Sequence, residues 1–166
     1  IEHLMSILVS LELSEDDEDF MQIRSELAQY GYIKKNSSSK NIKIKSKPIH
    51  FISSDGFDIF VGKNNYQNEE VTFKKAAPED WWFHAKGVPG SHVIVKTEGR
   101  EMTDRAFEEA AGLAAYYSKS GKNDKVEVDY IQRKNVKKVN GGVPGFVIYH
   151  NNWSMSISPS NKLHEV

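Results

Sequence analysis

Residues 80–95 constrain the fold of this chain more than any other stretch. They read Asp-Trp-Trp-Phe-His-Ala-Lys-Gly-Val-Pro-Gly-Ser-His-Val-Ile-Val, so two apolar segments flank a Pro89-Gly90 turn signal. Aromatic and β-branched residues favour a pleated, half-buried surface, whereas Pro and Gly favour turns. We therefore predict two strands joined by a tight polar bend. Tryptophan side chains are large and mostly buried, and we favour a core position for Trp82 over an exposed platform that faces a partner.

Turn signals on both sides of this stretch predict further strands in a mainly antiparallel sheet. Asp55-Gly56 separates two apolar segments, which is a strong short-range hairpin signal. Asn151-Asn152, residues that tolerate a left-handed turn, separates residues 146–149 from 153–157 and predicts a last hairpin. Residues 126–131 alternate as in a strand with one buried face.

The clearest helix is expected after Thr103, a favourable N-cap residue, and before Gly121. Its apolar stripe is rich in alanine, so it can lie close against a sheet. A shorter helix is expected over residues 68–77, where Pro78 stops it. One Ala-rich helix packed on an antiparallel sheet makes an α+β fold.

The first 33 residues predict two short amphipathic helices, with Ser14 as the N-cap of the second and Gly31 as its stop. Their apolar stripes have heptad-like spacing, which is typical of the end of a coiled coil. A helical hairpin packed on the body is the alternative interpretation. Residues 34–47 are polar and predict a linker, and residues 48–166 are expected to form the main domain.

Composition indicates a soluble globular protein with an uneven distribution of charge. Of 166 residues, 39% are hydrophobic, 27% are charged and none is cysteine, which fits a reducing compartment such as the cytoplasm. No apolar run reaches the roughly 20 residues of a membrane-spanning helix. The missing initiator methionine predicts a fragment of a longer protein. Residues 1–30 carry a net charge of −7 and the remainder +6, so the body permits a polyanionic partner.

The sequence offers little support for catalysis or for a cofactor. His84 and His92 lie eight residues apart without a third ligand at a useful spacing, so no metal site is expected. No phosphate-binding glycine loop and no Gly-x-Ser-x-Gly motif occurs, and the lack of cysteine excludes a thiol nucleophile. We therefore expect a binding protein without a cofactor rather than an enzyme.

Three polar turns, at residues 63–65, 86–92 and 133–138, make RNA the partner that we favour. Cations contact phosphates and exposed aromatic rings stack on unpaired bases. A basic run that is merely a solvated face, or a protein-interaction module, is the alternative. If the three turns converge on one face, the RNA-binding residues are Lys63, Asn64, Asn65, His84, Lys86, Ser91, His92, Arg133, Lys134, Lys137 and Lys138.

Three motifs in the right order resemble the NFACT-R family, once called domain of unknown function 814. The first is Val61-Gly62-Lys63-Asn64-Asn65 with Gln67-Asn68, and the second is Asp80-x-Trp82-x-His84-x-Lys86-x-x-Pro89-Gly90-Ser91-His92-Val93-Ile94. The third is Asn135-Val136-Lys137-Lys138 followed by Gly141 and Pro144-Gly145-x-Val147-x-Tyr149. The resemblance covers about residues 48–160.

The resemblance implies a part in ribosome-associated quality control. Members of the family bind a large ribosomal subunit that holds a stalled peptidyl-tRNA, recruit tRNA and support addition of a C-terminal alanine tail. Trp81 and Val143 depart from the family pattern, in which a small aliphatic residue and a lysine are frequent. The competing interpretations are a fibronectin-binding surface adhesin, after an older label of the family, and a domain that contacts ribosomal protein rather than RNA.

Overall fold

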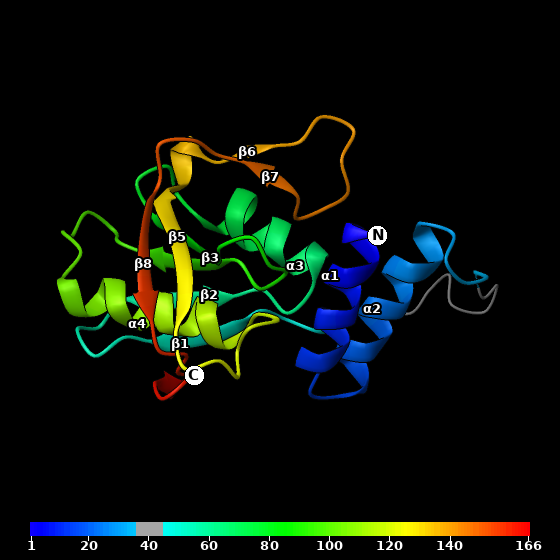
Figure 1. Cartoon of the computed structure of the whole chain (residues 1–166), viewed down its shortest axis with the longest axis horizontal. Helices are drawn as coiled ribbons and strands as arrows, with labels where there is room; N and C mark the ends of the chain where they lie inside the picture. Colours follow the sequence, from blue (N-terminus) through cyan, green and yellow to red (C-terminus); the bar gives the residue numbers. More distant parts are fainter. Residues whose placement is uncertain (36–44) are drawn as a thin grey trace.

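The computed structural model describes residues 1–35 and 45–166. The described part is an α+β fold with a mainly antiparallel sheet, as the sequence predicts, and a pair of helices lies at one end of this sheet (Figure 1). The linker predicted at residues 34–47 falls mostly outside the described residues. Within those residues, no helix is long and apolar enough to cross a membrane.

The stretch of residues 80–95 supplies two of the central strands of the sheet, paired in the register Trp82 to Ile94. Within the described residues the sheet has the strand order β8-β5-β3-β4-β2-β1-β9, and each neighbouring pair is antiparallel. Its strands are β1 (Ile49–Ile52), β2 (Asp58–Val61), β3 (Trp81–Ala85), β4 (Val93–Lys96), β5 (Val126–Gln132), β8 (Trp153–Ile157) and β9 (His164–Glu165).

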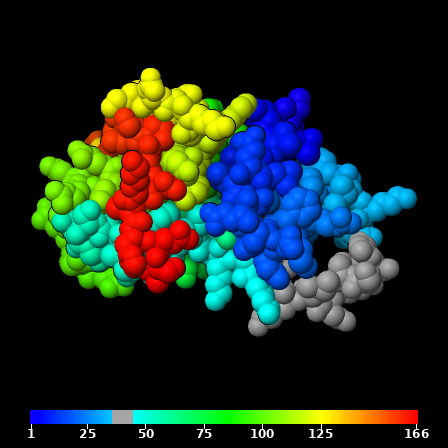
Figure 2. Space-filling view, turned by 90° about the horizontal axis from the view of Figure 1, so that it is seen from below, coloured from blue at the N-terminus to red at the C-terminus, as the bar shows by residue number. Residues whose placement is uncertain are grey.

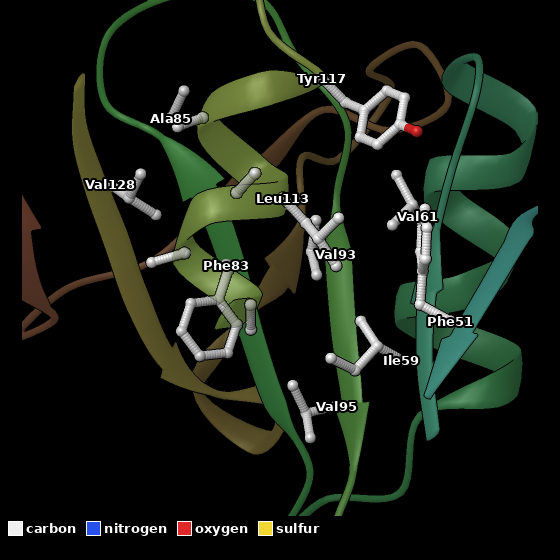
Figure 3. Close-up of a cluster of buried hydrophobic side chains, with 14 of the residues drawn as sticks. Phe51, Ile59, Val61, Phe83, Ala85, Val93, Val95, Leu113, Tyr117 and Val128 are labelled. Atoms are coloured by element: carbon white, nitrogen blue, oxygen red, sulfur yellow. The ribbon is translucent and has the colours of Figure 1, made fainter. Parts of the chain in front are cut away.

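Helix α4 (Asp104–Tyr116) covers one face of the sheet, and the side chain of Thr103 caps it by accepting a hydrogen bond from Ala106 N. Its small residues let Leu113 pack directly against Phe83 and Val93 of the strands (Figure 3). Trp81 lies on this same face, with its ring centroid 4.8 Å from that of Phe107. The tryptophan that departs from the family pattern therefore enlarges the packing against α4.

The opposite face of the sheet carries a second apolar core formed by Val71, Trp82, Ile94, Ile131 and Val136. Alternation along a strand sends successive side chains to opposite faces, so Trp82 faces away from Trp81. The short elements on this side of the sheet are α3 (Asn65–Glu70), the π-helical turn η2 (Val71–Lys75), the single turn η3 (Arg133–Asn135) and the paired strands β6 (Lys137–Lys138) and β7 (Val147–Ile148) (Figure 1). Phe73 of η2 and Val147 of β7 pack against the second core.

Two local predictions within residues 48–166 are wrong. The helix expected over residues 68–77 begins earlier, at Asn65, because the side chain of Asn64 accepts a hydrogen bond from Gln67 N and caps it. The last hairpin does not form, although Asn151 does adopt the expected left-handed φ of 59°. The chain turns at Asn151, but β7 pairs with β6 and β8 pairs with β5, so long-range pairing determines the partner of each strand.

The two N-terminal helices are present as expected and lie side by side against the end of the domain near α3 (Figures 1 and 2). They are α1 (Glu2–Leu13) and α2 (Asp17–Gln29). Asp16, rather than Ser14, caps α2 by accepting from Asp19 N, because the hydroxyl of Ser14 donates back to Leu11 O of α1. The structure shows a helical hairpin packed on the body; its continuation as a coiled coil stays a prediction.

Candidate nucleic-acid interface

A cleft of about 530 Å³ opens between the second face of the sheet and the N-terminal hairpin. Four segments that are distant in sequence surround it: α1, the start of α3, β3 with the turn that follows it, and the loop that contains β7. Its lining residues are Glu2, Met5, Ser6, Asn65, Asn68, Trp82, His84, Gly87, Val88, Pro89, Gly90, His92, Gly145, Phe146, Val147 and Tyr149.

Trp82 forms one wall of this cleft and also belongs to the core, as the core interpretation of the sequence predicts. Its side chain is 0% exposed, and its ring centroid lies 4.8 Å from that of Tyr149 and 5.2 Å from that of His92. The indole Nε1 is buried and has no hydrogen-bond partner among the described residues. Buried indole N–H groups usually find a partner, so an unpaired one on a residue that lines the cleft is unusual.

The two histidines of the stretch lie next to each other, with ring centroids 5.5 Å apart. His92 is 3% exposed; its Nδ1 is 2.8 Å from the hydroxyl of Thr72, and its backbone N donates to Asn68 Oδ1. Burial lowers the pKa of His84, and burial together with the neighbouring His84 lowers the pKa of His92 well below 6.5. Both imidazoles are therefore neutral at physiological pH.

A buried carboxylate ties the loop of β7 to the sheet beside the cleft. Asp129 Oδ2 accepts a hydrogen bond from the hydroxyl of Tyr149 at 2.6 Å, and its Oδ1 accepts from Ser154 at 2.6 Å. Burial raises the pKa of this carboxyl, but the two hydrogen bonds and the Lys86 ammonium at 3.4 Å outweigh burial and hold the pKa below its usual value. Lys86 is half exposed at the rim of this network.

The predicted turn of Lys63, Asn64 and Asn65 lies under the helical hairpin rather than open to a partner. Lys63 Nζ is 2.6 Å from Asp19 Oδ1, and Asn64 Nδ2 donates to the side chain of Gln22 on α2. Asn65 Nδ2 donates to Ser6 of α1 and to Glu26 of α2, and Asn65 also lines the cleft. Ser91 is buried in a small pocket behind this turn, and its hydroxyl has no partner among the described residues.

The basic run divides into two parts. Arg133 Nε donates to Thr72 O and its guanidinium lies over the ring of Phe73, while Lys134 pairs with the exposed Glu79 at 3.2 Å. Lys137 and Lys138 are exposed on β6.

Of the predicted site residues, the structure brings some to the cleft and leaves others elsewhere. Asn65, His84 and His92 line the cleft. Lys138 lies next to it, because its strand partner Val147 is a lining residue, and its Nζ is 3.8 Å from Glu69 Oε1. Lys137 pairs with Ile148, which does not line the cleft.

The sequence reasoning missed the lining residues that come from α1 and from the loop around Phe146. Asn68, Gly145 and Tyr149 lie in the family motifs but are not among the predicted site residues. Gly145 has a φ of +83°, and a Cβ there would lie 3.1 Å from Asn65 O, so glycine permits the close approach of the two segments. Met5 and Ser6 carried no comparable signal, because an amphipathic helix does not reveal which surface it packs against.

Comparisons with known proteins find relatives of this chain that cover most of its length. Residues 47–150 match the family described as the NFACT protein RNA binding domain. The Rqc2 homolog RqcH of Streptococcus suis is 41% identical over 161 residues, which is 96% of this chain and 28% of that protein. The protein of the same name from Bacillus subtilis is 39% identical over 144 residues, covering 85% of this chain and 25% of that protein. The chain thus spans about a quarter of the length of these relatives.

A solved structure shares the whole architecture. The C-terminal part of the fibronectin/fibrinogen-binding protein from Streptococcus suis matches with a TM-score of 0.85 at 40% identity, over 96% of this chain and 63% of that chain. The coiled-coil domain-containing protein 25 of Bos taurus is 26% identical over 121 residues, which is 69% of this chain and 58% of that protein. The three sequence motifs, the matched residues and these identities together show that the chain belongs to the NFACT RNA-binding domain family.

Proposed function

We propose that this chain is the RNA-binding domain of a cytoplasmic factor of ribosome-associated quality control, and that it binds rather than catalyses. The observation that carries this proposal is the cleft with neutral aromatic and imidazole walls beside the exposed Lys137 and Lys138. Ammonium groups attract phosphates, and aromatic side chains stack on unpaired bases. The combination suits single-stranded segments of RNA better than a duplex, because bases in a duplex are already stacked.

The wider setting rests on the relatives named Rqc2 homolog RqcH. We place the whole protein on the large ribosomal subunit, where it engages tRNA and supports addition of alanine to the C-terminus of a stalled chain. This chain corresponds to about a quarter of such a protein, so its part is RNA contact rather than the complete activity.

A salt titration of RNA binding tests the proposal. The double variant Lys137→Gln/Lys138→Gln is expected to bind RNA more weakly and with a flatter salt dependence, by about 0.7 in the log–log slope for each lost phosphate contact. Lys122→Gln/Lys125→Gln, which removes the same charge from exposed positions in the loop after α4, is the control. Equal affinities and slopes for the two double variants contradict phosphate contact at β6.

Fibronectin binding is the second candidate, favoured by the name of the Streptococcus suis neighbour. Co-sedimentation with ribosomes and capture on immobilised fibronectin, carried out with the same preparation, separate the two functions. Binding to fibronectin without binding to ribosomes or RNA reverses the choice. Binding to ribosomes that survives removal of exposed RNA by nuclease indicates contact with ribosomal protein instead.

A further inference from the structure

The size and the walls of the cleft limit what can occupy it. Its volume of about 530 Å³ lies within the range of roughly 300–1,000 Å³ that is typical of small-molecule sites. One wall is made of rings: Trp82 packs against Tyr149, and His84 stacks on Trp82 with an interplanar angle of 9°. Aromatic faces and flat imidazoles favour a planar ring system over a branched aliphatic group.

The charges around the cleft indicate which part of a nucleotide lies inside it. Among its described lining residues no lysine or arginine occurs, and the only charged one is Glu2. A phosphate inside would therefore meet no cation, whereas a neutral base would meet the partly exposed rings of His84 and Tyr149. The exposed cations Lys137 and Lys138 lie outside, on the strand paired with the lining residue Val147.

We propose that the cleft accepts one unstacked purine base of single-stranded RNA, with the adjoining phosphates directed toward Lys137 and Lys138. The proposal rests on the RNA-binding function and specifies the ligand of that site. A purine fits better than a pyrimidine because its two fused rings cover more of the aromatic wall. The contacts are stacking contacts with the partly exposed rings of His84 and Tyr149, which pack on the buried Trp82.

A mononucleotide titration observed by NMR tests the cleft directly. The indole N–H resonances of the three tryptophans are assigned with Trp81→Phe and Trp153→Phe variants, and adenosine monophosphate is then added to the whole chain. The Trp82 resonance is expected to shift in a saturable manner, whereas that of Trp153, which is 56% exposed on β8, stays unchanged. Equal shifts of all three resonances, or none at Trp82, overturn the proposal.

A pair of variants, one of which blocks the cleft, tests the base pocket separately from RNA binding as a whole. Met5→Trp places a large side chain in the cleft, and Leu4→Trp places the same side chain one residue along α1 at an exposed position that does not line it. Met5→Trp is expected to weaken binding of a short adenine-containing RNA roughly 5- to 150-fold, the range that one base–aromatic stack supplies. Leu4→Trp is expected to leave binding unchanged.

The same RNA with single abasic sites provides the complementary measurement. One abasic position is expected to reduce affinity as much as Met5→Trp does, with no further loss when the two changes are combined. If the chain binds RNA through Lys137 and Lys138 but neither abasic sites nor Met5→Trp affect it, the base pocket is refuted and RNA binding stands. If the chain binds no RNA at all, the proposed function fails first.

Discussion

Replacing Lys63 with methionine is expected to weaken the docking of the helical hairpin by about 3 kcal/mol. The side chains of Asp19 and Lys63 are 1% and 11% exposed, and their charged atoms are 2.6 Å apart. Removal of one partner from a buried ion pair costs roughly 3–5 kcal/mol, because the other charge is left buried. Asp19 keeps hydrogen bonds from the hydroxyl of Ser46 at 2.6 Å and from Glu15 N at 3.0 Å, so the lower end of the range applies.

Urea unfolding together with hydrogen exchange measures this loss, since exchange distinguishes undocking of α2 from unfolding of the sheet. Lys134→Met is the matched control: it breaks a pair with Glu79 in which both side chains are about half exposed, and such pairs contribute less than about 1 kcal/mol. The double variant Asp19→Leu/Lys63→Met is expected to recover part of the loss, because it leaves no buried charge behind. If Lys63→Met is no more damaging than Lys134→Met, the buried-pair reasoning is refuted.

Two further predictions concern the second core and pH. Trp82→Ala is expected to cost roughly 3–5 kcal/mol of folding stability in thermal melts, whereas Trp153→Ala, at an exposed position, is expected to cost much less. Loss of RNA binding by Trp82→Ala at an unchanged melting temperature would make this residue a stacking platform instead. Because the pKa of His92 is lowered in the folded state, below about pH 6.5 the unfolded chain binds a proton that the native chain does not. Stability should then fall as pH falls, by up to about 1.4 kcal/mol per unit, and His92→Gln should flatten this slope. Burial raises the pKa of the Asp80 carboxyl, but hydrogen bonds and Lys96 outweigh burial and hold this pKa low. The contribution of Asp80 to folding stability is therefore present above pH 3.8 and lost below it. An acid titration of the unfolding free energy checks the pH ranges of His92 and Asp80.

Local patterns were sufficient to predict the strands but not all of their partners. Asp55-Gly56 lies between two segments that pair with each other, so a local turn signal and the long-range pairing agree there. At Asn151 the turn conformation was predicted correctly, yet the segments on its two sides belong to different sheets. A turn signal specifies backbone dihedral angles, whereas the partner of a strand depends on which apolar faces the rest of the fold has to cover.

The candidate site was predictable to the extent that its residues lie on the motifs of residues 80–95 and of the basic run. The buried ion pair of Lys63 could not be predicted, because its partner Asp19 is 44 residues away and no local pattern indicates that the two residues meet. The only relevant signal was the net charge of −7 in the first 30 residues beside a basic body. Such an asymmetry favours contact between the two parts but does not select the residues that make it.

The docked hairpin makes the N-terminal helices part of the wall of the cleft. Asn65 connects the two: its amide donates to Ser6 and Glu26 on the hairpin, and the same residue lines the cleft together with Trp82. Ser6 and Met5 of α1 also line the cleft, so the cleft has its present shape only while α1 is in place. Since buried polar contacts such as Lys63 with Asp19 hold the hairpin there, the Lys63–Asn65 turn shapes the cleft indirectly. It positions the helices that enclose the cleft, whereas the lysines of β6 are exposed and Lys138 lies 3.8 Å from Glu69.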